Sequence, residues 1–211
     1  MRLAIDHIVY IVPDFESALD DLEGKLGVRP QVGGRHLSRG TKNALLNLGN
    51  ECYLEVLAAD PENTTFLGER WMGVDLIKKP TISRWAIQSA NIEHDCQVLK
   101  KYHPNLGEIA AGERKTQEGD ILRWKMSLPL ALPQIEIVPF LLDWSTSAYH
   151  PTKKLEEACK LLEIKFFHPQ PEIVNPIFQQ LNLPYIVGSS GNAKIEVHIQ
   201  GRKHIDPIVI T

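Results

Sequence analysis

The sequence predicts an α+β fold in which tandem β-α-β-β modules form cupped mixed sheets around a cleft, with the helices outside. Two observations support this fold class. Stretches rich in β-branched residues alternate with amphipathic helical stretches, and the order strand-helix-strand-strand recurs with a period of roughly 75 residues. The chain also has 211 residues, 43% of them apolar, which is enough to bury a sizeable core.

The first predicted module occupies residues 1–80 and begins with a strand over residues 3–12. Asp14 is expected to start a helix and Gly27 to end it, since Asp accepts from free N–H groups and Gly adopts left-handed conformations. Three strands follow, over residues 31–37, 44–48 and 52–57. The long connection after them is expected to carry a short helix that includes Trp71.

The second predicted module, residues 81–150, repeats this order. Its elements are a strand over residues 82–88, a helix from Asn91 through His103, and strands over residues 107–111, 121–128 and 135–142. Pro139 interrupts the last strand, which favours an edge position or a bulge.

The third predicted segment, residues 151–211, is a helix plus a partial module. Its elements are helices over residues 154–162 and 173–181, strands over residues 163–167, 185–187 and 193–199, and a hairpin turn over residues 189–192. We expect the three segments to form one compact unit.

Composition excludes several classes of protein. The net charge is −3 and no stretch concentrates Lys and Arg, so a nucleic-acid partner is not expected. No window approaches the ~20 uninterrupted apolar residues of a membrane span, and we expect no signal peptide at the N-terminus. Cys52, Cys96 and Cys159 are widely spaced and odd in number, which implies no disulfide framework. We therefore expect a cytoplasmic protein.

An ordered series of short motifs runs through the first 151 residues. The series is Asp6-His7-Ile8-Val9, Pro13-Asp14, Gly33-Gly34-Arg35-His36, Gly40-Thr41-Lys42-Asn43, Tyr53-Leu54-Glu55-Val56-Leu57, Ser83-Arg84-Trp85-Ala86, Leu122-Arg123-Trp124, Pro139-Phe140-Leu141-Leu142-Asp143-Trp144 and His150-Pro151. Together these motifs resemble the glyoxalase-like domain of the vicinal oxygen chelate superfamily. The resemblance implies a cleft between paired modules.

The resemblance also implies a pattern of metal ligands. In metal-using relatives, each paired module supplies one ligand from its first strand and one from its last strand. His7 matches the first position and Glu55 the second. Imidazole and carboxylate both suit divalent Zn, Mn, Fe or Ni. Strand alternation places His7 on one face with Val9, and Glu55 on one face with Tyr53. His7 and Glu55 are therefore the candidate catalytic residues and the candidate metal ligands.

The second module departs from this pattern, because Arg84 stands where His7 stands in the first. Arginine cannot ligate a metal. Arg84 could instead bind an anionic group of the substrate or form an ion pair with Glu55. A further alternative pairs the first and third segments, which would bring Glu163 and Glu196 towards His7 and Glu55.

Two more residues are candidates for substrate binding. His36 lies in a Gly-rich segment between two arginines and is expected at the rim of the cleft. Asn43 could hold a substrate oxygen. The structural alternatives are an exposed loop for His36 and a turn for Asn43.

These residues predict a glyoxalase-like enzyme, a metal-dependent lyase, isomerase or dioxygenase that acts on a small oxygen-rich molecule. The alternative is a metal-free protein that binds or sequesters a small ligand in the same cleft. The partner is in either case a small molecule, and the resemblance also allows a homodimer formed by module pairing.

Overall fold

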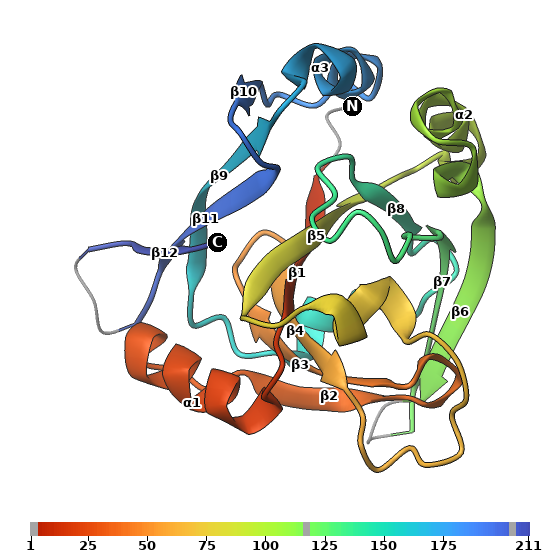
Figure 1. Ribbon diagram of the computed structural model, residues 1–211. Helices are drawn as coiled ribbons and strands as arrows, with labels where there is room; N and C mark the ends of the chain where they lie inside the picture. Colours follow the sequence, from red (N-terminus) through yellow and green to blue (C-terminus); the bar gives the residue numbers. More distant parts are fainter. Residues whose placement is uncertain (1–3, 116–118, 203–205) are drawn as a thin grey trace.

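The computed structural model describes residues 4–115, 119–202 and 206–211. An eight-stranded sheet has the order β2-β3-β4-β1-β5-β8-β7-β6, and a four-stranded sheet has the order β10-β9-β11-β12. The larger sheet curls on itself, while the smaller sheet and the α-helices lie outside it (Figure 1). The predicted α+β class, with a cupped sheet and outer helices, is confirmed.

The elements follow the predicted order in the first two modules. The first contains β1 (Ile5–Ile11), α1 (Phe15–Leu26), β2 (Gln31–His36), η1 (Leu37–Arg39), β3 (Thr41–Asn47), β4 (Tyr53–Ala59) and η2 (Trp71–Leu76). The second contains β5 (Thr81–Gln88), α2 (Ile92–Tyr102), η3 (Pro104–Gly107), β6 (Ile109–Lys115), β7 (Ile121–Ser127) and β8 (Phe140–Asp143). The remaining elements are η4 (Pro151–Lys154), β9 (Lys160–His168), α3 (Pro171–Gln180), β10 (Val187–Ser189), β11 (Lys194–Gln200) and β12 (Ile208–Ile210).

The first two modules have the same strand connectivity and pair with each other through their first strands. Each first strand pairs in parallel with the last strand of its own module, β1 with β4 and β5 with β8. The first strands β1 and β5 then pair antiparallel with each other. This junction makes one continuous curled sheet whose concave face receives side chains from both modules.

The predicted caps explain where the first two helices begin. The Asp14 carboxylate accepts from the backbone N–H of Ser17 at 3.0 Å, and Asn91 plays the same role for α2. Gly27 ends α1 with φ 74°, a left-handed conformation that glycine adopts without a Cβ clash. The apolar face of each helix is buried against the convex side of the large sheet.

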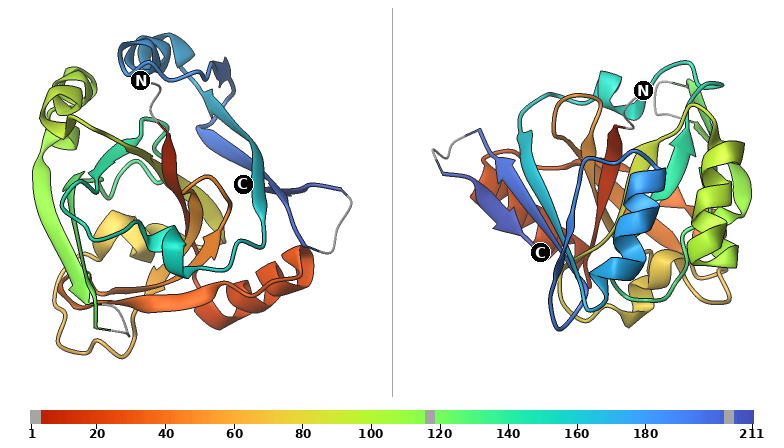
Figure 2. Two further views of the ribbon diagram at one scale, coloured as in Figure 1. Left: turned by 180° about the vertical axis from the view of Figure 1, so that it is seen from behind. Right: turned by 90° about the horizontal axis from the view of Figure 1, so that it is seen from above.

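Alternation along β1 separates the two faces of the sheet. Ile8 and Tyr10 belong to the large core cluster, together with the inner faces of the helices and of the small sheet. Val9 and Ile11 belong to a second apolar cluster on the other side. The small sheet and α3 complete the large core beside β1 and β5 (Figure 2), where the rings of Trp85 and Phe166 lie 4.5 Å apart.

The predictions for the last segment need correction. The helix expected over residues 154–162 is wrong, because the chain forms η4 and then enters β9, which pairs with β11. Backbone pairing in the sheet overrides the helical spacing of its apolar residues. The hairpin expected at residues 189–192 is also wrong, because β10 pairs in parallel with β9 rather than with β11.

Two further expectations differ from the structure. The strand predicted over residues 135–142 is reduced to β8, because the preceding prolines and the packing of the 130–134 segment keep that stretch irregular. The pairing of the first and third segments is wrong as well. Glu163 and Glu196 lie on the small sheet, where each carboxylate pairs with a lysine. Within the described ranges, no helix is long and apolar enough to span a bilayer.

Candidate functional site

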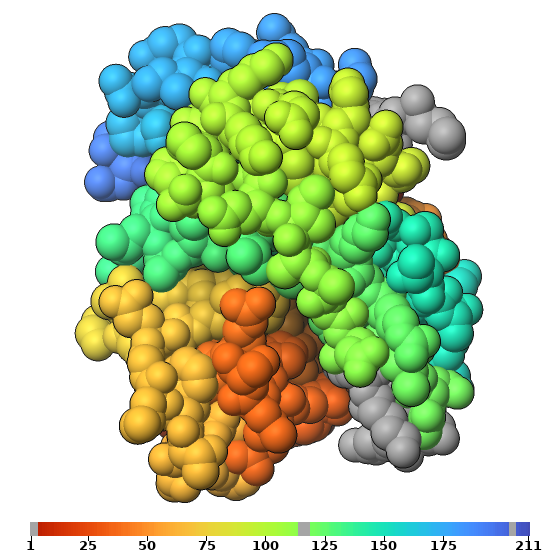
Figure 3. All heavy atoms as spheres, turned by 90° about the vertical axis from the view of Figure 1, so that its right-hand side faces the viewer, coloured from red at the N-terminus to blue at the C-terminus, as the bar shows by residue number. Residues whose placement is uncertain are grey.

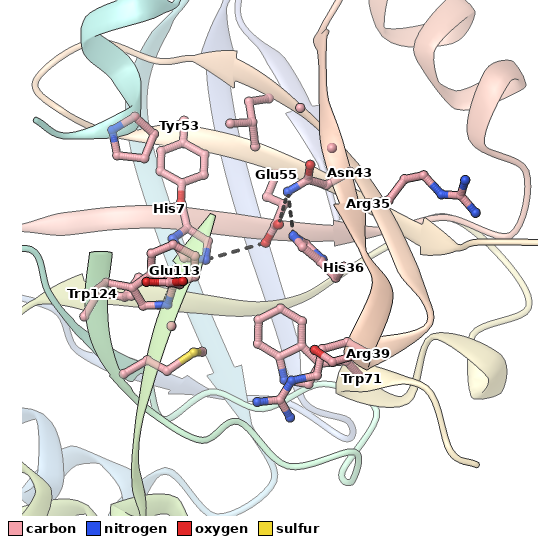
Figure 4. Close-up of a pocket in the computed structure, with 18 of the residues that line it drawn as sticks. His7, Arg35, His36, Arg39, Asn43, Tyr53, Glu55, Trp71, Glu113 and Trp124 are labelled. Carbon is pink, nitrogen blue, oxygen red and sulfur yellow. Dashed lines mark hydrogen bonds and ion pairs between the residues drawn. The ribbon is translucent and has the colours of Figure 1, made fainter. Parts of the chain in front are cut away.

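The concave face of the large sheet holds a pocket with a volume of about 590 Å³. The first module supplies residues of β1, β2, η1, β3 and β4 to its wall, and the second supplies residues of β6, β7 and β8. In Figure 3 the surface is hollowed between the orange segment of the first module and the green strands of the second. Figure 4 shows that polar side chains from several strands converge inside it.

His7 lies on the wall of this pocket, and its imidazole is oriented by its neighbour. His7 Nδ1 is 2.6 Å from Asp6 Oδ1. The pairing of β1 with β5 is irregular between Ile5 and His7, so a bulge falls at Asp6. Because a bulge re-aims a side chain, it explains how two adjacent strand residues can meet. The ring of Tyr53 stacks on His7 at 4.7 Å and fixes the plane of the imidazole.

Asp6 is fully buried and accepts three hydrogen bonds. Besides His7, the indole Nε1 of Trp144 donates to Asp6 Oδ2 at 2.7 Å, and His150 Nε2 lies 3.1 Å from the same oxygen. Burial raises the pKa of Asp6, but the hydrogen bonds from His150 and His7 outweigh it and lower the pKa to about 2. Asp6 is therefore a carboxylate at neutral pH, and a carboxylate only accepts hydrogen bonds.

This charge determines the tautomers of both histidines. Since Asp6 cannot donate, His7 Nδ1 and His150 Nε2 must carry protons. The backbone N–H of Thr152 donates to His150 Nδ1, so His150 is the neutral Nε2–H tautomer. For neutral His7 the lone pair then resides on Nε2, the nitrogen nearer Glu55.

Glu55 approaches His7 from β4, in agreement with the predicted strand parity. Glu55 Oε2 lies 3.7 Å from His7 Nε2, too far for a hydrogen bond but close enough for both atoms to contact one ligand atom. The amide of Asn43 donates to Glu55 Oε1 at 2.6 Å and holds the carboxylate in place. Both carboxylates next to His7 are therefore fixed by other side chains.

The position of Asn43 depends on a glycine in the neighbouring strand. A Cβ added at Gly33 would lie 2.4 Å from Asn43 Oδ1, whereas a Cβ added at Gly34 would meet no atom within 4 Å. A side chain at position 33 would therefore displace Asn43. His36, on the same strand, lies 3.4 Å from Asn43 Nδ2 through its Nε2 and reaches the pocket as predicted.

The mouth of the pocket carries two arginines with different surroundings. Arg35 Nε donates to the buried carboxylate of Asp60 at 2.6 Å. Arg39 instead lies over the indole of Trp71, with 5.3 Å between the guanidinium carbon and the ring centroid. The edge of His36 also faces this indole.

Comparison with known proteins identifies the family. A family model described as a glyoxalase-like domain matches residues 5–181. The chain belongs to the glyoxalase-like domain family. This confirms the resemblance to a glyoxalase-like domain on which the expected site rested. No curated protein is significantly similar to the chain.

Several solved structures are similar to the chain at low sequence identity. A hypothetical protein from Staphylococcus aureus is 16% identical, with a TM-score of 0.66, covering 92% of this chain and 88% of that one. Methylmalonyl-CoA epimerase from Streptomyces coelicolor is 13% identical (TM-score 0.45, coverage 70% and 98%). The enzyme of the same name from Mycobacterium tuberculosis is 17% identical (TM-score 0.41, coverage 66% and 86%).

The donor set of this glyoxalase-like pocket does not fit a resident catalytic metal. Such a site usually takes three or more protein ligands, and His7 and Glu55 supply two. In the second module Ala86 lies opposite His7, and β8 presents Phe140 and Leu142 to the pocket. Throughout the part of the chain that the structure describes, no three His, Cys, Asp or Glu side chains converge as metal ligands.

Arg84 lies away from the pocket wall. Its side chain is 2% exposed, and its guanidinium donates to the backbone carbonyls of Leu130, Pro133 and Gln134 at 2.6–3.0 Å. Burial lowers the pKa of Arg84 to about 10, although Glu136 partly opposes this. The alternative ion pair with Glu55 is not formed. Arg84 instead holds the 130–134 segment against the sheet.

Sequence reasoning missed the residues that support His7. Asp6 stood beside His7 in the first motif, but no role was predicted for it. Trp144 and His150 were noted as motif residues without a role, and they reach Asp6 from 138 and 144 positions away in the chain. The sequence held one signal for this contact: Asp6 lies in the first motif of the series, and Trp144 and His150 lie in the last two.

Proposed function

We propose that the chain is a glyoxalase-like enzyme that moves a proton within a small oxygen-rich molecule, as an isomerase or lyase. The observation that carries this proposal is the row Asp6–His7–Glu55, with distances of 2.6 and 3.7 Å, in which His7 and Glu55 line the pocket and Asp6 is buried. A histidine whose Nδ1–H is held by a carboxylate is oriented to act through Nε2 as a general base.

The proposed step starts at a carbon next to a carbonyl group. His7 Nε2 takes the proton, and the electron pair of the C–H bond moves into the carbonyl group to give an enolate. The proton then returns to the adjacent atom, or a leaving group departs with the electron pair. Asp6 and Glu55 flank the imidazolium that forms and stabilise its positive charge.

The short separation of His7 Nε2 and Glu55 Oε2 favours transfer of a proton between neighbouring atoms of the substrate. His7 Nε2 and Glu55 Oε2 lie 3.7 Å apart on the same wall, so the imidazolium formed at His7 can return its proton to a neighbouring substrate atom while the Glu55 carboxylate beside it stays charged. No step in this proposal passes through a metal ion. Metal dependence and dioxygenase chemistry are therefore tested separately, as alternative outcomes of the experiment.

The test is solvent exchange. The purified protein is incubated in deuterated buffer with a panel of α-hydroxy and α-keto carbonyl compounds, and NMR measures deuterium at the carbon next to the carbonyl. We expect exchange with the wild type and its loss in His7→Asn and Glu55→Gln. His94→Asn, which changes an exposed histidine outside the pocket, is the matched control.

Two outcomes would overturn parts of the proposal. Exchange that needs added Mn, Fe, Ni or Zn and stops with a chelator would replace it with metal-dependent chemistry at His7 and Glu55. Binding of panel compounds without exchange under any of these conditions would support the alternative of a binding or sequestering protein.

A further inference from the structure

We propose that this pocket binds an anionic oxygen group of its ligand at a subsite formed by Arg39 and Trp71, the anion subsite. The inference deepens the proposed function, because it names the chemical class of the ligand for the same pocket. It rests on three observations within the described part of the chain: an arginine without a counter-charge, a buried indole N–H without an acceptor, and apolar walls beside them.

Arg39 is the arginine at the mouth of the pocket that has no charged partner among the described residues. Of the two arginines at the mouth, Arg35 is paired with the buried Asp60 and also lies 3.3 Å from Glu62. Arg39 makes no hydrogen bond or ion pair to any other described residue and only stacks on Trp71. A guanidinium presents several N–H donors in one plane, which matches a carboxylate or a phosphate.

Trp71 adds a second donor to the same place. Its Nε1 is buried and has no hydrogen-bond partner in the described ranges. Two other indoles in the chain are satisfied, since Trp85 donates to the carbonyl of Ile137 and Trp144 donates to Asp6. A buried N–H without an acceptor costs free energy. A ligand oxygen held by Arg39, which stacks on this indole, becomes the missing acceptor when the side chains around the indole shift, because Nε1 is not exposed in this structure.

The rest of the pocket indicates an apolar body for the ligand. Tyr53, Trp124 and Phe140 also line the pocket and supply aromatic walls. A pocket of about 590 Å³ exceeds the needs of a simple inorganic anion and lies within the range of organic ligands. The ligand class is therefore an organic carboxylate or phosphate ester with an apolar portion and, under the proposed function, a carbonyl group.

The test uses three probes of one size: phenylacetate, phenyl phosphate and the neutral phenylacetamide. The chain has four tryptophans, so a proton–nitrogen NMR spectrum shows few indole N–H signals. The Trp71 signal is assigned from its loss in Trp71→Phe. The change in the chemical shift of this signal during titration with a probe gives the binding constant. The same change shows that the probe contacts the subsite.

We expect at least one anion to shift the Trp71 signal and to bind more tightly than the amide. Arg39→Gln should weaken the binding of that anion by about 10- to 100-fold, which is the usual effect of losing a hydrogen bond to a charged group. The matched control is Arg202→Gln, which changes an exposed arginine paired with Glu156 outside the pocket. It should bind like the wild type. The ratio of the two anion affinities distinguishes a carboxylate from a phosphate ligand.

Equal affinity for the anions and the amide, no binding of either anion, or wild-type affinity in Arg39→Gln would each overturn the anion subsite. These results do not depend on catalysis. His7→Asn should bind the anions normally while losing deuterium exchange, so failure of the subsite and failure of the proposed reaction can be told apart.

Discussion

His7 Nδ1 and Asp6 Oδ1 lie 2.6 Å apart, although the two residues are neighbours in one strand. Neighbouring strand residues ordinarily point to opposite faces of a sheet. The bulge in the β1–β5 pairing allows the contact, and Trp144 and His150 fix the other oxygen of the carboxylate. The base of the proposed reaction and the group that orients it therefore form one rigid unit.

Asp6→Asn should lower the stability of the fold at neutral pH and reduce its sensitivity to acid. The pKa of Asp6 is lowered from 3.8 to about 2. A group with a lowered folded-state pKa stabilises the fold above its unfolded pKa, and this stabilisation is lost as the pH falls through the folded pKa. The shift corresponds to about 2 kcal/mol, about half of which is lost near pH 3.

Urea unfolding of the wild type and the variant at about pH 7 and about pH 3 measures this difference. Asp20→Asn, at an exposed carboxylate on α1, is the control. If Asp6→Asn and the wild type lose the same free energy of unfolding between the two pH values, Asp6 does not carry the stabilisation assigned to it.

Glu55→Gln should abolish most activity while the fold survives. The new side chain is nearly isosteric, and its carbonyl oxygen can still accept from Asn43, so the melting temperature should change little. Loss of the negative charge next to His7 should slow deuterium exchange by about 100-fold or more. Glu163→Gln, on the small sheet, should leave the exchange rate unchanged. Full activity in Glu55→Gln would remove Glu55 from the proposed mechanism.

Gly33→Ala and Gly34→Ala form a matched pair that tests the support of Glu55. The Cβ of the first variant would meet Asn43 Oδ1 and force the amide to turn, so Glu55 loses its hydrogen bond. The second variant adds a methyl group in open space. We expect a clear loss of exchange activity in Gly33→Ala alone, measured at a temperature where both variants are folded. Equal activities would contradict this role of Asn43.

Arg84→Met should destabilise the protein without a direct effect on the pocket. The change removes the donors that satisfy the carbonyls of Leu130, Pro133 and Gln134. Leaving buried carbonyls unsatisfied should cost about 3 kcal/mol or more in the free energy of unfolding. Arg123→Met, at an exposed arginine, should cost much less. An unchanged free energy of unfolding in Arg84→Met would show that Arg84 does not hold the 130–134 segment.

Local patterns predicted the first two modules well because local interactions decide them. Asp14 and Gly27 cap α1 through contacts within one turn, and the alternation of β1 separates its two faces. The last segment was predicted less well, because residues 154–162 have helical spacing, whereas residues 160–162 pair with β11 in the small sheet. That partner lies far along the chain, and no local pattern reveals it.

The sequence by itself determined the elements of the first two modules, their order, and the shared face of His7 and Glu55, since strand alternation depends only on the spacing of residues. Only the tertiary structure decided what surrounds those two residues. The bulge that turns Asp6 towards His7, and the use of Arg84 to hold the 130–134 segment, depend on contacts between distant segments. A buried polar group must find its hydrogen-bond partners wherever the fold brings them, and spacing along the chain does not specify that place.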